Sequence, residues 1–137
     1  MQNFYPYIKL YLGVLAVFLA VDALWLGLVA RIFYQQQLGH LLKASPNWLA
    51  ALAFYLLFVV GLLVFVVVPA VAAGQLKQAI LLGFFFGVVS YATYDLTNLA
   101  TLEGWPALVV VIDILWGGVL AMTCSVAGFY LWGLVGG

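Results

Sequence analysis

Four long runs of apolar residues, separated by short polar segments, dominate the pattern along this chain. A helix needs about 20 apolar residues to cross the hydrocarbon core of a bilayer, and each run reaches that length. Because the four runs take up most of the chain, we expect a single membrane domain over 1–137 with an all-α fold, a bundle of four transmembrane helices. The predicted spans cover about residues 7–30, 48–68, 76–96 and 106–131.

Composition agrees with this pattern. The chain is 69% hydrophobic and 6% charged, whereas a soluble domain carries about 25% charged residues. Its 4 Lys+Arg balance its 4 Asp+Glu, and that balance excludes a nucleic-acid surface, which needs clustered basic residues. The first predicted partner of the chain is therefore the lipid bilayer.

The first run has the features of a retained helix rather than of a cleaved signal peptide. Its apolar part is too long for a signal peptide, and it contains Asp22. The polar connection 31–47 predicts that the first helix extends past Arg31 and is followed by a short interfacial turn or helix. The second span has no ionisable side chain except Tyr55, and we expect it to serve mainly in lipid-facing packing.

Small residues recur at helical spacing in three of the spans. Such stripes let the backbone of a second helix approach closely. In the third and fourth spans the stripes also include polar side chains, so close crossings would lead into a polar region. The stripes are Gly13, Ala16, Ala20, Ala23 and Gly27 in the first span, Gly83, Gly87, Tyr91 and Asp95 in the third, and Asp113, Gly117, Ala121 and Ser125 in the fourth.

Three aspartates, Asp22, Asp95 and Asp113, lie inside the apolar runs. The first and third spans run in one direction and the fourth runs back. At a rise of about 1.5 Å per residue, all three acids then fall in the half of the bilayer nearest the 31–47 and 98–105 loops. Acids inside a membrane mark a functional site by default, so we predict that the three meet in one intramembrane polar site.

Further side chains of the predicted site come from two patterns. The end of the third span supplies Tyr91, Tyr94 and Asn98 beside Asp95. Trp25 and Trp116 each follow an aspartate by three residues, and we expect these two aromatic side chains to flank one shared feature. The acids are then neutral and hydrogen-bonded, or they hold a cation, or they line a wet cavity. A purely structural network that joins the helices stays open as an alternative.

The sequence predicts neither a metal site nor a cofactor. His40 is the only histidine, which excludes a histidine-rich metal site and a bis-histidine haem within one chain. No serine, histidine and acid occur together inside the spans. We therefore assign no catalytic residue.

Short motifs follow one another along nearly the whole chain: Asp22-x-x-Trp25-Leu26-Gly27, Tyr34, Leu38-Gly39, Pro46-Asn47, Phe54-Tyr55, Pro69-Ala70, Tyr94-Asp95-Leu96-Thr97-Asn98-Leu99-Ala100-Thr101, Trp105-Pro106 and Asp113-x-x-Trp116-Gly117. In these motifs the chain resembles the bacterial membrane-protein family called domain of unknown function 2177. The resemblance implies a small, multi-pass protein of the bacterial inner membrane and supplies no activity.

The orientation in the membrane follows only from that resemblance. By the count of Lys and Arg the two sides tie, which also permits both orientations. Family members are basic near positions 35–36, where this chain has Gln35 and Gln36. The resemblance thus implies that the 31–47 loop faces the cytoplasm and that both termini lie outside.

Three functions of different classes fit these residues. The preferred one is a small proton- or cation-linked transporter or channel-like protein, in which the three acids bind the ion and a homo-oligomer completes the pathway, because four helices make a thin wall. The second is a membrane enzyme that handles a lipid, an isoprenoid or another small-molecule ligand, although no catalytic signature favours it. The third is an accessory subunit of a membrane complex.

Overall fold

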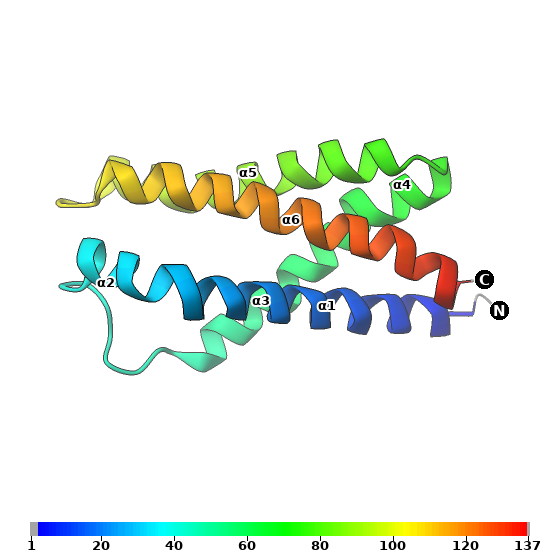
Figure 1. The fold of residues 1–137 in the computed structure, drawn as a ribbon, viewed down its shortest axis with the longest axis horizontal. Coiled ribbons are helices and arrows are strands. Elements are labelled where there is room, and N and C mark those ends of the chain that lie inside the picture. Colours follow the sequence, from blue (N-terminus) through cyan, green and yellow to red (C-terminus); the bar gives the residue numbers. More distant parts are fainter. Residues whose placement is uncertain (1–2, 137) are drawn as a thin grey trace.

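Each apolar run forms one long helical span in the computed structural model, which describes residues 3–136 (Figure 1). All four spans are long and apolar enough to cross a membrane. The described residues form helices and turns without any strand, and the predicted all-α, four-helix membrane fold is confirmed. The elements are α1 (Tyr5–Trp25), η1 (Leu26–Ala30), α2 (Arg31–Leu38), α3 (Trp48–Leu62), η2 (Leu63–Val67), α4 (Val68–Ala73), α5 (Leu76–Thr101) and α6 (Ala107–Val135).

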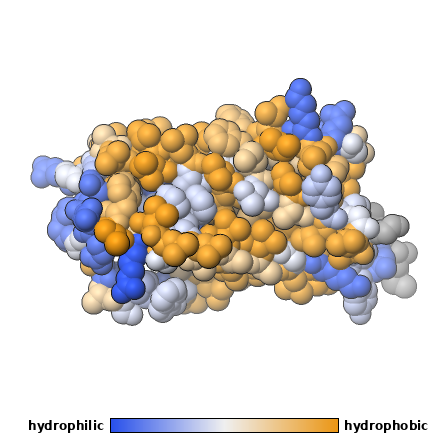
Figure 2. Space-filling model, viewed as in Figure 1, coloured by the Kyte–Doolittle hydropathy of each residue, from blue (hydrophilic) through white to orange (hydrophobic). Residues whose placement is uncertain are grey.

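The face of the bundle seen in Figure 2 is a broad apolar belt between two more polar ends. Large side chains such as Leu28, Leu57 and Leu134 point outward. In water such a surface would be unfavourable, whereas the hydrocarbon core of a bilayer solvates it. The chain is therefore a multi-pass membrane protein. Both described ends of the chain lie at one end of the bundle, and the turns 39–47 and 102–106 lie at the other (Figure 1).

The first span continues without a break past Arg31, as the sequence predicted, and ends at Leu38. A turn at Gly39 follows, and the segment 39–47 contains no further helix. The next span begins where Asn47 caps it, because the Asn47 side chain accepts a hydrogen bond of 3.2 Å from the backbone N–H of Ala50.

The second span lies inside the bundle more than the sequence predicted. It crosses the other helices diagonally, from the lower left to the upper right of Figure 1. Its side chains from Phe58 to Val67 supply half of the buried apolar core, next to Leu10, Val14 and Phe18 of α1. The first half of the span is largely exposed to lipid, as expected, whereas its second half also forms part of the core. A helix that is apolar on every side gives no pattern that reveals which side packs on protein.

The second span also continues beyond Pro69, to Ala73, and ends at Gly74. Proline lacks a backbone N–H and crowds the preceding turn, so it normally kinks a helix or ends it. Here the turn directly before it, η2, is a π-helix, whose wider hydrogen-bonding pattern accommodates the proline. Gly74 has a φ of 64°, a left-handed conformation that ends the helix.

Facing glycines bring α5 and α6 into close antiparallel contact. A Cβ atom at Gly87 would overlap the backbone carbonyl of Gly117, and one at Gly83 would lie 2.6 Å from Ser125 Oγ. The ring of Tyr91 covers Gly117 on the same face. The small-residue stripes of the third and fourth spans therefore pack against each other.

The stripe on the first span packs differently. Gly13 lies against Leu131 of α6, but Ala16, Ala20, Ala23 and Gly27 are exposed on the outer surface. Within the chain, α1 contacts its neighbours through the larger side chains of its core face. The close helix approach that this stripe allows is thus not made by another helix of the described chain.

Candidate functional site

A cavity of about 370 Å³ lies among all four spans, in the half of the bundle nearest the 39–47 and 102–106 turns. Two of the three intramembrane aspartates open onto it, Asp22 from α1 and Asp113 from α6. Most of the remaining wall is aromatic. The aromatic side chains are Trp25, Tyr34, Phe54, Tyr55, Tyr91, Tyr94 and Trp116.

The two cavity acids are almost fully enclosed by protein. Asp22 is 9% exposed and Asp113 is 8% exposed, and they lie close enough for their charges to interact. The Tyr34 hydroxyl donates a hydrogen bond to Asp113 Oδ1. Asp22 lies beside the side chains of Trp116 and Tyr55, yet the indole N–H of Trp116 makes no hydrogen bond to any described residue. The Asp22 carboxyl therefore retains the capacity to accept a partner in the cavity.

A π-helical turn in the first span brings Tyr34 to the cavity. Tyr34 follows Asp22 by 12 positions, and in a regular α-helix, which turns about 100° per residue, the two would point about 120° apart. The π turn η1 lies between them and absorbs one extra residue. The remaining 11 or so α-helical steps bring Tyr34 to within about 20° of Asp22. Ala30 and Leu38 share this face and are buried.

The two tryptophans form a parallel stack in the wall of the cavity. Their ring centroids are 4.3 Å apart and their planes differ by 7°. In each span the tryptophan follows its aspartate by one helical turn, and α1 and α6 run in opposite directions (Figure 1). The rings of Trp25 and Trp116 therefore meet at one level, with Asp22 and Asp113 on opposite sides of the stack along the helix axes.

A second cavity of about 370 Å³ adjoins the first between α3 and α5. The two share Phe54, Tyr91, Tyr94 and Asp113, and Ser90 lines only the second. Tyr94 is 54% exposed on the outside of the bundle. The acidic cavity thus extends toward the lipid-facing surface between these two helices.

The third acid, Asp95, lies apart from the cavity. It is 0% exposed, it is absent from the cavity walls, and both of its carboxyl oxygens lack a hydrogen-bond partner among the described residues. The pairing of Gly87 with Gly117 places Tyr91 level with Asp113 and leaves Asp95 about one turn nearer the α5–α6 connection. There it lies beside Trp105, without a hydrogen bond to the indole N–H.

The structure therefore brings together most, but not all, of the predicted site residues. Asp22, Asp113, Tyr91, Tyr94, Trp25 and Trp116 line one cavity. Asp95 and Asn98 do not line it, and Asn98 lies beside the hydroxyl of Tyr94. This separation differs from the predicted meeting of all three acids. The physical reason is that the Gly87–Gly117 crossing sets Asp95 one turn beyond Tyr91, level with Val109 of α6 rather than with Asp113.

Three side chains that lie beside the acids were not among the predicted site residues. They are Tyr34 beside Asp113, Tyr55 beside Asp22 and Trp105 beside Asp95. Tyr55 could have been selected as the only ionisable side chain of an otherwise apolar span. Tyr34 could not, because a regular helical pattern directs it away from Asp22.

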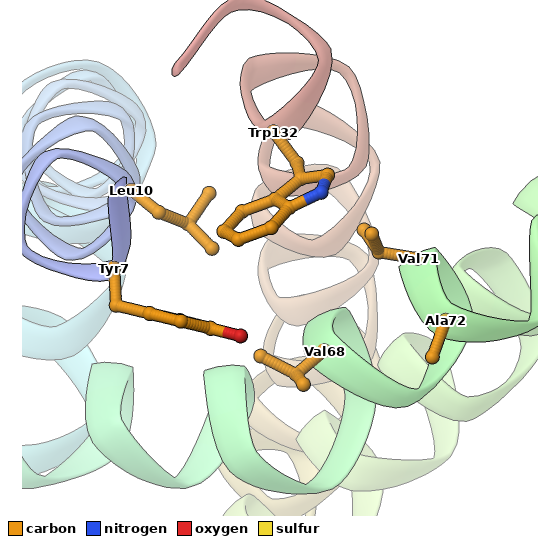
Figure 3. A pocket seen from close by; sticks show the side chains of 6 residues that line it. All are labelled: Tyr7, Leu10, Val68, Val71, Ala72 and Trp132. Carbon is orange, nitrogen blue, oxygen red and sulfur yellow. The ribbon is translucent and has the colours of Figure 1, made fainter. Parts of the chain in front are cut away.

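A cavity at the opposite end of the bundle has a different character (Figure 3). It has a volume of about 260 Å³ and lies among Tyr7, Leu10, Val68, Val71, Ala72 and Trp132. Tyr7 and Trp132 contact each other with centroids 5.0 Å apart, as is common where a helix end reaches the headgroup level. No acid or base lines this cavity, so the candidate site is the acidic one.

The Tyr34–Asp113 hydrogen bond leads to a first testable prediction. We expect Tyr34→Phe to lower the melting temperature of the purified protein, since hydrogen bonds between membrane helices contribute about 0.6 kcal/mol on average and up to about 1.7 kcal/mol. The loss of this donor should also speed labelling of Asp113 by a membrane-permeant carbodiimide. Tyr130→Phe is the control, because that side chain is exposed near the other end of the bundle. Equal melting temperatures and labelling rates for both variants would contradict the assigned contact.

Comparison with known proteins places the chain among membrane proteins. A family model described as "Predicted membrane protein (DUF2177)" matches residues 7–130. No curated protein and no solved structure matches the chain. The family match confirms the resemblance seen in the sequence motifs, and its description gives no activity.

Proposed function

We propose a transport function for this chain, which belongs to the DUF2177 family of predicted membrane proteins: Asp22 and Asp113 bind a proton or a cation in the membrane as part of its movement across the bilayer. The observation that carries the proposal is the enclosure of both acids in one cavity whose lining contains no basic side chain. Acids that face an internal cavity of a membrane protein serve ion and proton pathways in this way.

The low polarity of the site supports a coupling between the binding of a proton and the binding of a cation. A net charge is costly to hold in the interior of a membrane protein. When a monovalent cation enters the cavity, release of one proton from the acid pair leaves the net charge unchanged. When the cation leaves, a proton returns to the pair. Alternate occupancy by a proton and a cation therefore offers the least costly cycle for this pair.

The proposal includes the membrane in which the protein lies and a second copy of the chain. The membrane is the bacterial inner membrane, as the resemblance implies. A second copy of the chain completes the pathway, because four helices alone make a thin wall. The exposed small residues Ala16, Ala20, Ala23 and Gly27 of α1 offer a face on which a helix of that copy can approach closely.

Flux through liposomes tests the proposed function. We expect liposomes with the wild-type protein to release or take up protons when a gradient of Na⁺, K⁺ or an organic ammonium ion is imposed, as reported by an enclosed pH-sensitive dye. Asp22→Asn and Asp113→Asn should each lower this rate by about tenfold or more. Glu103→Gln is the matched control, because it makes the same change of acid to amide in an exposed turn.

Two results of that experiment would argue against transport. One is a wild-type rate equal to that of protein-free liposomes under every gradient. The other is an equal loss of rate in Glu103→Gln, which would show that the cavity acids have no special part. Asp95→Asn should retain most of the flux, since Asp95 does not line the cavity.

A further inference from the structure

We infer that the cation bound by this site is an amphipathic organic cation, an ammonium or phosphonium group carrying an apolar body, and that it enters the cavity sideways from the lipid. The inference rests on the proposed function, because it names the class of cation that the same two acids would accept.

The chemistry of the cavity wall suits an organic cation. Beside the two acids, the wall consists mainly of aromatic side chains, including the stacked pair Trp25 and Trp116 and the rings of Phe54 and Tyr55. Aromatic faces attract cations, most strongly where water is excluded, and they also pack against apolar groups. A carboxylate next to aromatic faces therefore complements both the charge and the apolar body of such a molecule.

The same wall suits an inorganic ion poorly. A bare metal cation needs several oxygen ligands arranged closely around it, as Ca²⁺ takes about 6–8 and Mg²⁺ about 6. Among the described residues, no three His, Cys, Asp or Glu side chains lie close enough to hold a metal ion. Asp22 and Asp113 supply the only carboxylates of the lining, and its other side-chain oxygens are neutral tyrosine hydroxyls, which are weaker ligands for a bare metal ion.

The size of the cavity leads to the same ligand class. The acidic cavity and the one adjoining it each measure about 370 Å³, within the range of about 300–1,000 Å³ that is usual for pockets that bind small molecules. A proton needs no such space. Asp22 and Asp113 are both more than nine-tenths buried yet open onto this volume, so a ligand there would meet both acids.

The shape of the bundle provides an entry from the lipid. The second cavity lies between Phe54 of α3 and Ser90, Tyr91 and Tyr94 of α5, and it also reaches Asp113. At this end α3 runs diagonally away from α5 (Figure 1), and α5 packs instead against η2 further along the same span. The half-exposed ring of Tyr94 lies at this opening. An amphipathic molecule that partitions into the bilayer reaches the acids by this route without crossing the polar ends of the bundle.

A pair of ions with the same shape and opposite charge tests the inference. Tetraphenylphosphonium and tetraphenylborate would be compared by equilibrium dialysis against the full chain in detergent micelles. We expect tetraphenylphosphonium to bind saturably and tetraphenylborate to bind at least about tenfold more weakly. Asp113→Asn should weaken tetraphenylphosphonium binding by about tenfold or more, and Trp116→Leu by about threefold or more.

A cavity-filling variant keeps the test valid if the acid variants fold poorly. Ala51 lines the cavity, so Ala51→Trp should block tetraphenylphosphonium without changing any charge. Ala53→Trp is the matched control, because Ala53 lies on the outer surface of the same helix and this variant should bind like the wild type.

The possible results separate the inference from the proposed function. Equal binding of the two ions, or binding unaffected by both Asp113→Asn and Ala51→Trp, would overturn the inference. If tetraphenylphosphonium fails to bind while acid-dependent proton flux with Na⁺ or K⁺ persists, the inference fails and the proposed function stands. If binding follows the expected pattern and no gradient drives flux, the ligand class stands and the transport proposal fails.

Discussion

Substitution of Gly87 by leucine is expected to unfold or strongly destabilise the protein. A Cβ atom at this position would overlap the backbone carbonyl of Gly117, and two helix backbones cannot yield as a flexible side chain can. Overpacking of a well-packed interior costs about 1–3 kcal/mol and sometimes more. A whole leucine side chain at this crossing should reach or exceed the upper end of that range, because α5 and α6 must separate along the contact that holds Tyr91 over Gly117.

Thermal unfolding followed by size-exclusion chromatography is the appropriate measurement. Gly133→Leu serves as the matched control, since a Cβ atom there meets nothing within 4 Å and the residue lies on the exposed surface of α6. We expect a large fall in melting temperature, or loss of monodisperse protein, for Gly87→Leu alone. Similar melting temperatures for the two variants would show that α5 and α6 do not cross at these glycines.

Deletion of one residue from the first span is expected to be tolerated at one position and to unfold the protein at another. Removal of Val29 from η1 should convert the π turn into an ordinary α-helical turn, so that Asp22 and Tyr34 keep nearly the same angular relation. Removal of Leu19 from α1 should rotate Phe18 and everything before it by about 100° relative to Asp22. The second deletion therefore turns Leu10 and Val14 out of the core while the cavity residues stay in place.

The two deleted residues are comparable because both are exposed apolar side chains of the same span. We expect the Val29 deletion to have a melting temperature close to that of the wild type and the Leu19 deletion to lose most of its folded protein. The contact between positions 34 and 113 can be followed by cross-linking Tyr34→Cys to Asp113→Cys in a Cys124→Ala background. Loss of this cross-link in the Val29 deletion would contradict the role assigned to the π turn.

Much of the candidate site could be predicted because its residues are chemically conspicuous in an apolar chain. Each aspartate inside a span is costly unless it has a function or a partner, so Asp22 and Asp113 were found from the sequence pattern alone. The equal spacing of aspartate and tryptophan in two spans also indicated a shared feature, and the structure stacks Trp25 on Trp116. The glycine stripes of the third and fourth spans predicted a close crossing, and Gly87 lies against Gly117.

The position of Asp95 could not be obtained in the same way. Depth along the helix axis, counted from the ends of the spans, places it in the same half of the bilayer as the other two acids, but such a count does not resolve a difference of one helical turn. That level depends on the register of α5 against α6, which the Gly87–Gly117 contact fixes. One helical turn then separates an acid at the edge of the cavity from an acid enclosed beside Trp105.

The sequence by itself determined the membrane environment, the four helical spans and the small set of polar side chains inside them, because the lengths of apolar runs and the cost of buried charge are local properties. Only the tertiary structure decided which faces meet. Two π-helical turns, η1 and η2, shift the faces of the first and second spans by about one residue, or about 100°. The second span is apolar on every side, so only its packing against the other helices sets its diagonal path. The π-helical turn η1 and the diagonal path of the second span together place Tyr34 and Tyr55 at the cavity and leave the opening between α3 and α5.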